Sequence, residues 1–108
     1  MENNSKVLSF LGLLYRGRGI SLGDALLEDI KSKKVSLVIY AIDSGDSVKK
    51  KLLDKCSFYK IENIEMFSKI ELGNALGKGQ LSAVGVIDYK ASKKIKDSLK
   101  KEDANDEK

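Results

Sequence analysis

The 108-residue sequence contains no histidine and a single cysteine, Cys56. Without histidine, the common zinc sites and the Cys-His and Ser-His-Asp nucleophilic centres cannot be assembled from this chain. A lone cysteine cannot form an internal disulfide, and we expect Cys56 to be a small core residue on a helix. The 16 acidic residues are scattered along amphipathic segments, which is typical of solvated faces. We therefore expect no enzyme, no metal site and no cofactor.

The sequence also lacks any apolar run of about 18 residues, the length that crosses a bilayer. Its first residues lack the basic segment and apolar core of a secretion signal, so we expect a cytoplasmic protein. Apolar residues make up 42% and charged residues 33% of the chain, a balance typical of globular proteins. We expect one folded domain over residues 1–100. A disordered acidic tail is expected over residues 101–108, where the one apolar residue is an alanine.

The charge is unevenly distributed along the chain. The formal net charge is +4, and residues 101–108 hold two lysines and four acidic residues, a net of −2, which leaves +6 for residues 1–100. This basic domain favours an anionic partner. Nucleic acid is favoured over a membrane surface, because no basic amphipathic segment carries a bulky aromatic face.

Hydrophobic periodicity predicts helices that alternate with short strands. Val7, Leu11 and Leu14, for example, follow helical spacing. Because strands separated by helices need crossover connections, the helices should cover both faces of one sheet. The predicted fold is α/β, a three-layer α-β-α sandwich with a short mixed central sheet. The predicted elements are a helix at about 4–15, an extended piece at 20–21, a helix from 23–24, a strand at 35–41, a helix from 48, a short strand at 58–61, a helix ending at 76, a strand at 81–87 and a C-terminal helix.

The segment from Leu72 to Ile87 is the most informative part of the chain. A short helix ends at Gly77, a loop of Lys78, Gly79 and Gln80 follows, and an alternating strand then begins. A basic, glycine-containing loop between a helix and a strand can bring backbone close to a polyanion. The same pattern also fits an ordinary helix-ending glycine and turn.

This segment, read as Leu72-Gly73-x-Ala75-x-Gly77-Lys78, resembles the kink-turn-binding ribosomal protein family (the L-seven-Ae and L-thirty-e class), above all its small stand-alone bacterial members. The resemblance spans about residues 6–100. Further matching motifs, in order, are Phe10-Leu11-Gly12-Leu13, Gly17-Arg18, Val38-Ile39-Tyr40-Ala41-x-Asp43, and Lys49-Lys50-Lys51 with Asp54-Lys55-Cys56 and Tyr59.

The resemblance implies a non-enzymatic RNA-binding module that grips a sharply bent duplex carrying sheared G·A pairs. The expected partner is ribosomal RNA or another stable RNA, with ribosomal or ribonucleoprotein proteins as further partners and a monomeric state. In the family, the start of the second helix reads the bent RNA and the loop before the last strand packs against bulged nucleotides. By position, the first surface comprises Gly17, Arg18, Ser21, Leu22, Gly23 and Asp24, with Glu28 nearby, and the second comprises Lys78, Gly79, Gln80 and Leu81. The run Lys49–Lys51 lies further away and is expected to be a solvated face.

The start of the second helix departs from the family pattern. Archaeal members carry Gly-x-Asn-Glu-x-x-Lys there, where this chain holds Leu22, Asp24, Ala25 and Glu28. Aspartate lacks the two N–H donors of asparagine, and Glu28 places an acid where the family has lysine. A well-formed hydrogen bond to a base edge is worth about 1–3 kcal/mol, so these differences weaken the expected base recognition. Two hypotheses therefore stand: binding of structured RNA, and alternatively a protein-interaction module on the same fold whose RNA site has decayed.

Overall fold

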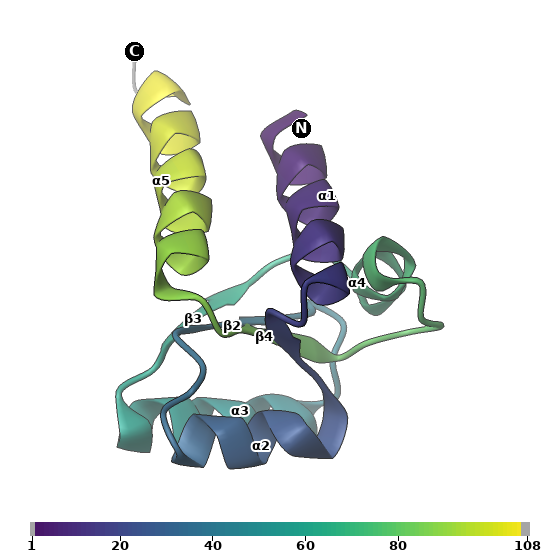
Figure 1. The fold of residues 1–108 in the computed structure, drawn as a ribbon, viewed down its shortest axis with the longest axis vertical. Helices are drawn as coiled ribbons and strands as arrows, with labels where there is room; N and C mark the ends of the chain where they lie inside the picture. The colour runs from purple at the N-terminus through teal and green to yellow at the C-terminus, as the bar shows by residue number, and fades with distance from the viewer. Residues whose placement is uncertain (1, 107–108) are drawn as a thin grey trace.

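In the computed structural model, which describes residues 2–106, a four-stranded sheet lies between helices on both of its faces (Figure 1). Helices α2 and α3 cover one face, and α1, α4 and α5 lie on the other. The predicted three-layer α/β sandwich is confirmed. In chain order the elements are α1 (Glu2–Arg16), β1 (Ile20–Ser21), α2 (Gly23–Lys31), β2 (Leu37–Tyr40), α3 (Asp46–Tyr59), β3 (Glu62–Glu65), α4 (Lys69–Leu76), β4 (Ala83–Val86) and α5 (Tyr89–Asp106).

The sheet is mixed, with strand order β1-β4-β2-β3. Strands β2 and β3 are parallel, with Ile39 opposite Ile64, whereas β4 is antiparallel to both β2 and β1. Every residue of β2 and β4 is buried, because helices cover both faces of these central strands. Burial on both faces explains the continuous hydrophobicity of β2, and it means that the alternation expected in the segment of β4 does not correspond to an exposed face.

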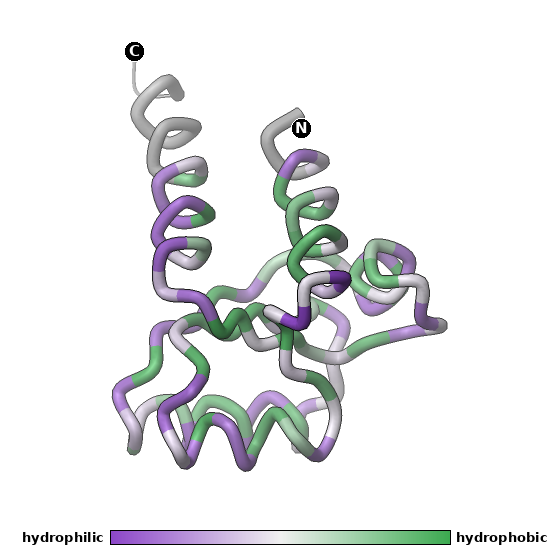
Figure 2. Tube along the Cα trace, viewed as in Figure 1, coloured by the Kyte–Doolittle hydropathy of each residue, from purple (hydrophilic) through white to green (hydrophobic). Residues whose placement is uncertain are grey.

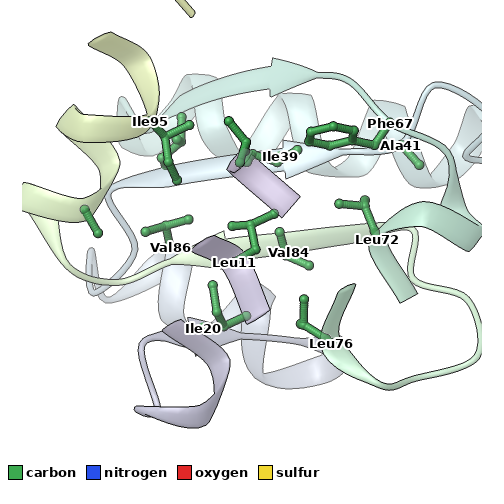
Figure 3. Close-up of a cluster of buried hydrophobic side chains, with 13 residues drawn as sticks. Leu11, Ile20, Ile39, Ala41, Phe67, Leu72, Leu76, Val84, Val86 and Ile95 are labelled. Carbon is green, nitrogen blue, oxygen red and sulfur yellow. The ribbon is translucent and has the colours of Figure 1, made fainter. Parts of the chain in front are cut away.

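Two hydrophobic cores form, one on each face of the sheet. On the first, side chains of α1, α4 and α5 pack against β2 and β4, with Leu11 and Leu72 fully buried (Figure 3). On the second, Ile30 of α2 packs together with Leu52 and Cys56 of α3. Cys56 is only 1% exposed, so it is the small helical core residue that the sequence predicts.

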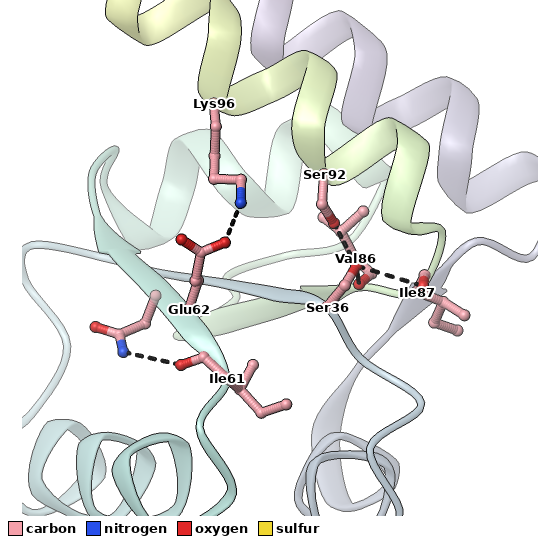
Figure 4. A network of polar contacts seen from close by, with 8 residues as sticks. Ser36, Ile61, Glu62, Val86, Ile87, Ser92 and Lys96 are labelled. Atoms are coloured by element: carbon pink, nitrogen blue, oxygen red, sulfur yellow. Dashed lines mark hydrogen bonds and ion pairs between the residues drawn. The ribbon is translucent and has the colours of Figure 1, made fainter.

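A short polar network joins α5 to the sheet (Figure 4). The hydroxyl of Ser92, which is fully buried, lies 2.6 Å from that of Ser36, and Ser36 donates to the carbonyl oxygen of Val86 at 3.2 Å. Lys96 of α5 forms an ion pair with Glu62 of β3. Figure 2 shows the hydrophobic side of α5 turned towards α1. The amphipathic helix is therefore held by apolar packing on one side and by polar contacts at its base.

Helix α5 continues to Asp106, whereas the sequence analysis expects a disordered tail from residue 101. Lysine, glutamate and alanine are good helix formers, so the helix can extend into this segment. Residues 107 and 108 of the expected tail lie outside the residues that the structure describes.

The predicted strand at 58–61 is wrong. Phe58 and Tyr59 form the last turn of α3, which ends where Lys60 adopts the left-handed conformation (φ 58°). The strand β3 follows at the edge of the sheet, and three of its four residues are exposed. Because β3 is polar, hydrophobic patterning could not find it, and the nearby aromatic residues were the stronger strand signal.

Gly85 in β4 allows α2 to lie directly on the sheet. A Cβ atom there would lie 2.5 Å from Cδ1 of Leu26 and 3.1 Å from both Cγ atoms of Val35. We expect Gly85→Ala to lower the free energy of unfolding by about 1–3 kcal/mol, because side chains must leave their rotamers or α2 must shift. Urea denaturation measures this change.

The matched control is Gly79→Ala, where an added Cβ meets nothing within 4 Å and the φ angle is not positive. Its free energy of unfolding should change by less than about 0.5 kcal/mol. Equal stability of the two variants would contradict the close packing of α2 on β4.

Candidate functional site

A tight turn at the end of α1 presents Arg18 to solvent. The N–H of Gly17 donates to the carbonyl oxygen of Leu13 at 3.2 Å, and that of Gly19 donates to Leu14 at 2.7 Å. Arg18 itself has a φ of 62°, in the left-handed region that few non-glycine residues adopt. The side chain is exposed, so its guanidinium group projects from the corner between α1 and β1.

The start of α2 is held by buried contacts but has no side-chain cap. Ser21 is buried, and its hydroxyl donates to the carboxylate of Asp29 at 2.7 Å, which ties β1 to α2. The N-cap residue, Leu22, offers no side-chain acceptor, and the first helical residue, Gly23, has a φ of 59°. Backbone N–H groups without a capping side chain at a helix start suit an anionic ligand. The Ser21 hydroxyl, in contrast, is already engaged within the protein.

The loop between α4 and β4 rests directly on α4. Helix α4 ends at Gly77, which has a φ of 75°, and the N–H of Lys78 then donates to the carbonyl oxygen of Gly73 at 2.8 Å. A Cβ atom on Gly73 would lie 2.4 Å from the carbonyl oxygen of Gly79. Glycine at position 73 therefore lets the loop lie against the helix, and the loop backbone is fixed by contacts with α4.

Lys78 extends from this loop towards the end of α1. Its Nζ atom lies 5.5 Å from the centroid of the Tyr15 ring, a cation–π contact between two distant parts of the sequence. Lys78, Gly79 and Gln80 are all exposed. The loop thus places a cation beside Tyr15 at the end of α1.

A groove of about 300 Å³ is lined by residues from both predicted surfaces. Gly23 comes from the start of α2, and Gln80 and Leu81 come from the loop before β4. It is not lined by the other predicted residues, which are Gly17, Arg18, Ser21, Leu22, Asp24, Glu28, Lys78 and Gly79. The groove is lined by Gly23, Leu26, Leu27, Val48, Lys51, Leu52, Gln80, Leu81, Ser82 and Ala83.

Helix α3 supplies the wall of the groove that sequence reasoning missed. Val48 is 38% exposed and lines the groove together with Lys51. Leu53 is likewise 38% exposed. The i, i+3 spacing of Val48 and Lys51 places them on one face of α3, but only the position of α2 makes that face a groove.

The three lysines of the run Lys49–Lys51 have different surroundings. Lys49 donates through Nζ to the carbonyl oxygen of Ile42 and to the carboxylate of Glu65, each at 2.8 Å. The hydrogen bond to Glu65 raises the pKa of Lys49 above its ordinary value. Lys50 is exposed, as expected of a solvated face, whereas Lys51 lines the groove. Lys51 is exposed, as expected, but it lies nearer to Gly23 and Gln80 than the expectation for the run implies.

Two acidic residues lie on α2 beside the groove. Asp24 and Glu28, spaced i and i+4, are both exposed. The carboxylate of Glu28 lies 3.8 Å from Nζ of Lys31, one turn further along the helix. This ion pair is largely solvated, so it holds the two side chains only weakly.

The one thiol of the chain is buried on α3. Burial raises the pKa of the Cys56 thiol to about 11, so the thiol stays protonated and unreactive at neutral pH. Within residues 2–106, no group of three or more histidine, cysteine, aspartate or glutamate side chains could hold a metal ion. In the same part of the chain, no helix is long and apolar enough to span a membrane.

The molecule is a small α/β domain with a groove at the start of α2. A family model, the Ribosomal protein L7Ae/L30e/S12e/Gadd45 family, matches residues 11–96, and the chain belongs to this family. The resemblance inferred from the sequence motifs is thereby confirmed. The expectation that the chain is not an enzyme agrees with this membership, since its curated relatives are named as RNA-binding proteins.

Two curated bacterial relatives align with most of the chain. RNA-binding protein YlxQ of Enterococcus faecium is 32% identical over 98 residues, which cover 90% of this chain and 94% of that protein. RNA-binding protein YlxQ of Bacillus subtilis (strain 168) is 31% identical over 86 residues, which cover 79% of this chain and 86% of that protein.

Solved structures share the fold. A protein with unknown function from Bacillus halodurans C superposes with a TM-score of 0.82 at 36% sequence identity, covering 88% of this chain and 97% of that one. The Giardia lamblia 15.5kD RNA binding protein superposes with a TM-score of 0.75 at 19% identity, covering 96% and 90% respectively. At that identity the second likeness concerns the fold alone.

We expect Gly73→Ala to displace the loop that borders the groove. The added methyl group would overlap the backbone of Gly79, so the loop must move or α4 must shift, at a cost of about 1–3 kcal/mol in unfolding free energy. Amide chemical shifts of residues 78–80 and their hydrogen exchange measure the displacement.

Asn74→Ala is the matched control, because Asn74 is the next residue of α4 and is exposed. It should leave the loop amides in place. If Gly73→Ala also left their shifts and protection unchanged, the loop would not be supported by α4 as described.

Proposed function

We propose that this protein binds structured RNA, a kink-turn-like or ribosomal element, without catalysing a reaction on it. The observation that carries the proposal is the groove in which the start of α2 meets the loop before β4. Gly23 lines it from one side and Gln80 and Leu81 from the other. These are the two segments to which the family resemblance assigns RNA contacts.

Three further features support an RNA ligand. The start of α2 has no side-chain cap, so its N–H groups are free to meet phosphate. Apolar Leu27 and Leu81 lie in the groove with the cation Lys51, a combination that suits unstacked bases beside their phosphates. The relatives from E. faecium and B. subtilis, which align with most of the chain, are named RNA-binding proteins.

The acidic side chains on α2 affect which RNA this chain can bind. Asp24 and Glu28 are exposed next to the groove, so phosphates that approach the start of α2 come within their electrostatic range, about 8–10 Å at physiological salt. We propose that they weaken binding to a standard kink-turn, and that the RNA recognised by this chain differs from it at the G·A pairs. Crosslinking in cells followed by sequencing identifies that RNA.

Binding should weaken steeply with salt, and Lys51 should contribute to that dependence. Each phosphate contact adds roughly −0.7 to −0.9 to the slope of log affinity against log salt. We expect Lys51→Gln to weaken binding to total ribosomal RNA and to make the slope shallower by about one unit. Filter-binding titrations at several salt concentrations measure both quantities.

Lys50→Gln is the matched control, because it removes the same charge from the neighbouring, exposed residue outside the groove. It should alter affinity less than about twofold. Salt-independent binding, or binding that is absent below about 10 µM, would reject RNA as the ligand and leave the protein-interaction alternative.

Restoring the archaeal residues on α2 should strengthen binding to a standard kink-turn RNA. The triple variant Asp24→Asn, Ala25→Glu, Glu28→Lys restores hydrogen bonds to bases worth about 1–3 kcal/mol each and replaces an acid by a cation. We expect at least a tenfold increase in affinity by gel-shift titration. All three residues are exposed, so thermal stability should not change.

The triple variant raises the net charge by two, and so does Asp97→Lys on the exposed surface of α5. That variant is the control for non-specific attraction, and its affinity should increase little. If the affinity of both variants increases equally, or that of neither increases, the start of α2 does not read a kink-turn in the manner of the family.

A further inference from the structure

One edge of α3 continues beyond the groove and ends in an exposed aromatic ring. Val48, Lys51, Lys55 and Phe58 follow one another at i, i+3, i+7 and i+10, so they form a stripe along one side of the helix. Phe58 is 77% exposed, more than any other large apolar side chain in the described part of the chain. It has no role in either hydrophobic core.

The Phe58 ring is braced by its neighbour. Its centroid lies 4.8 Å from that of Tyr59 at an interplanar angle of 79°, an edge-to-face pair. Tyr59 is partly buried and packs against the core between α2 and α3. The pair therefore fixes a side chain that would otherwise be free to rotate, while leaving most of its surface accessible to solvent.

A second depression lies beside this ring. It has a volume of about 510 Å³, and it is lined by Lys51, Asp54, Lys55, Phe58 and Tyr59. Lys51 also lines the groove between α2 and α3, so the two depressions share one lining cation. Two lysines against the single carboxylate of Asp54 leave the lining of this second depression basic.

We propose that the Lys51–Phe58 edge of α3 extends the RNA site, and that Phe58 stacks on the base of an unpaired nucleotide beside the structured element. The proposal rests on the RNA-binding function proposed above. In this proposal, the phosphates of the unpaired RNA segment lie against Lys51 and Lys55. Seven residues of helix separate Lys51 from Phe58, roughly 10 Å along the axis, which matches about three stacked-base steps of 3.4 Å.

The surroundings of Phe58 favour single-stranded RNA over an apolar protein surface. An aromatic face beside cations is the combination that binds unpaired bases with little sequence preference. A protein partner anchored on an aromatic residue is typically met by a continuous apolar patch. Here the neighbours of Phe58 along the edge are Lys55 and Lys51, and the next apolar residue of the stripe is Val48, inside the groove.

The test compares a kink-turn RNA with the same RNA carrying a short single-stranded adenosine tail that includes 2-aminopurine. The parent protein should bind the tailed RNA about tenfold more tightly and quench the 2-aminopurine fluorescence by stacking. Phe58→Ala should abolish both the tighter binding and the quenching while it binds the untailed RNA within twofold of the parent. Phe58→Tyr keeps an aromatic face and should retain both.

Circular dichroism melting should give the same midpoint for parent and Phe58→Ala, since the ring is exposed. If the parent binds both RNAs equally, or if Phe58→Ala still quenches, the stacking role of Phe58 is overturned while RNA binding by the groove stands. If Phe58→Ala weakens both RNAs alike, Phe58 contacts the structured element and the assignment to an unpaired base is overturned. If the parent binds neither RNA, the role of Phe58 beside a kink-turn is overturned, and the proposed function fails as well only if total ribosomal RNA is also not bound.

Discussion

The side chain of Leu26 occupies the space above Gly85 that the Cβ of another residue would fill, and the position of α2 depends on this contact. With α2 this close to β4, the start of the helix lies beside the segment that leads into the strand. That segment is the loop after α4, whose backbone is in turn held against Gly73. Close packing at two glycines therefore brings together Gly23 and Gln80, which are far apart in the sequence. The groove is a consequence of this tertiary packing.

Much of the fold could be predicted from the sequence, because its main elements bury one face or both. The period of Val7, Leu11 and Leu14 shows which side of α1 packs on the sheet, and the continuous hydrophobicity of β2 indicates burial on both sides. The polar edge strand β3 carries neither signal. It was therefore displaced in the prediction onto Phe58 and Tyr59, which belong to the last turn of α3.

The candidate site was only partly predictable. Gly23, Gln80 and Leu81 were assigned by resemblance to segments that the structure brings together in one groove. The position of Lys51 in the groove was missed because it depends on how α2 and α3 pack, and no spacing within the sequence specifies that arrangement. The role of these residues in binding RNA remains a prediction.

The net charge of the chain does not show which of its cations are available at the surface. Lys49 is hydrogen-bonded to Ile42 and Glu65, and Lys78 makes a cation–π contact with the ring of Tyr15. Lysines with such partners contribute less to an external field than freely solvated ones. Few cations line the groove and the α3 edge. The attraction of a polyanion to this surface therefore depends more on where each of these cations lies than on the net charge of the chain.

At position 18, the backbone conformation favours glycine, whereas the positive surface charge depends on arginine. Its left-handed backbone disfavours side chains with a Cβ by about 1 kcal/mol, a penalty that glycine would avoid. Selection of variants for heat resistance alone would therefore drive position 18 towards glycine and remove an exposed cation from the corner of α1. Laboratory evolution of this domain as a stable scaffold would remove the positive charge at this turn. The midpoint of thermal unfolding would not reveal the loss.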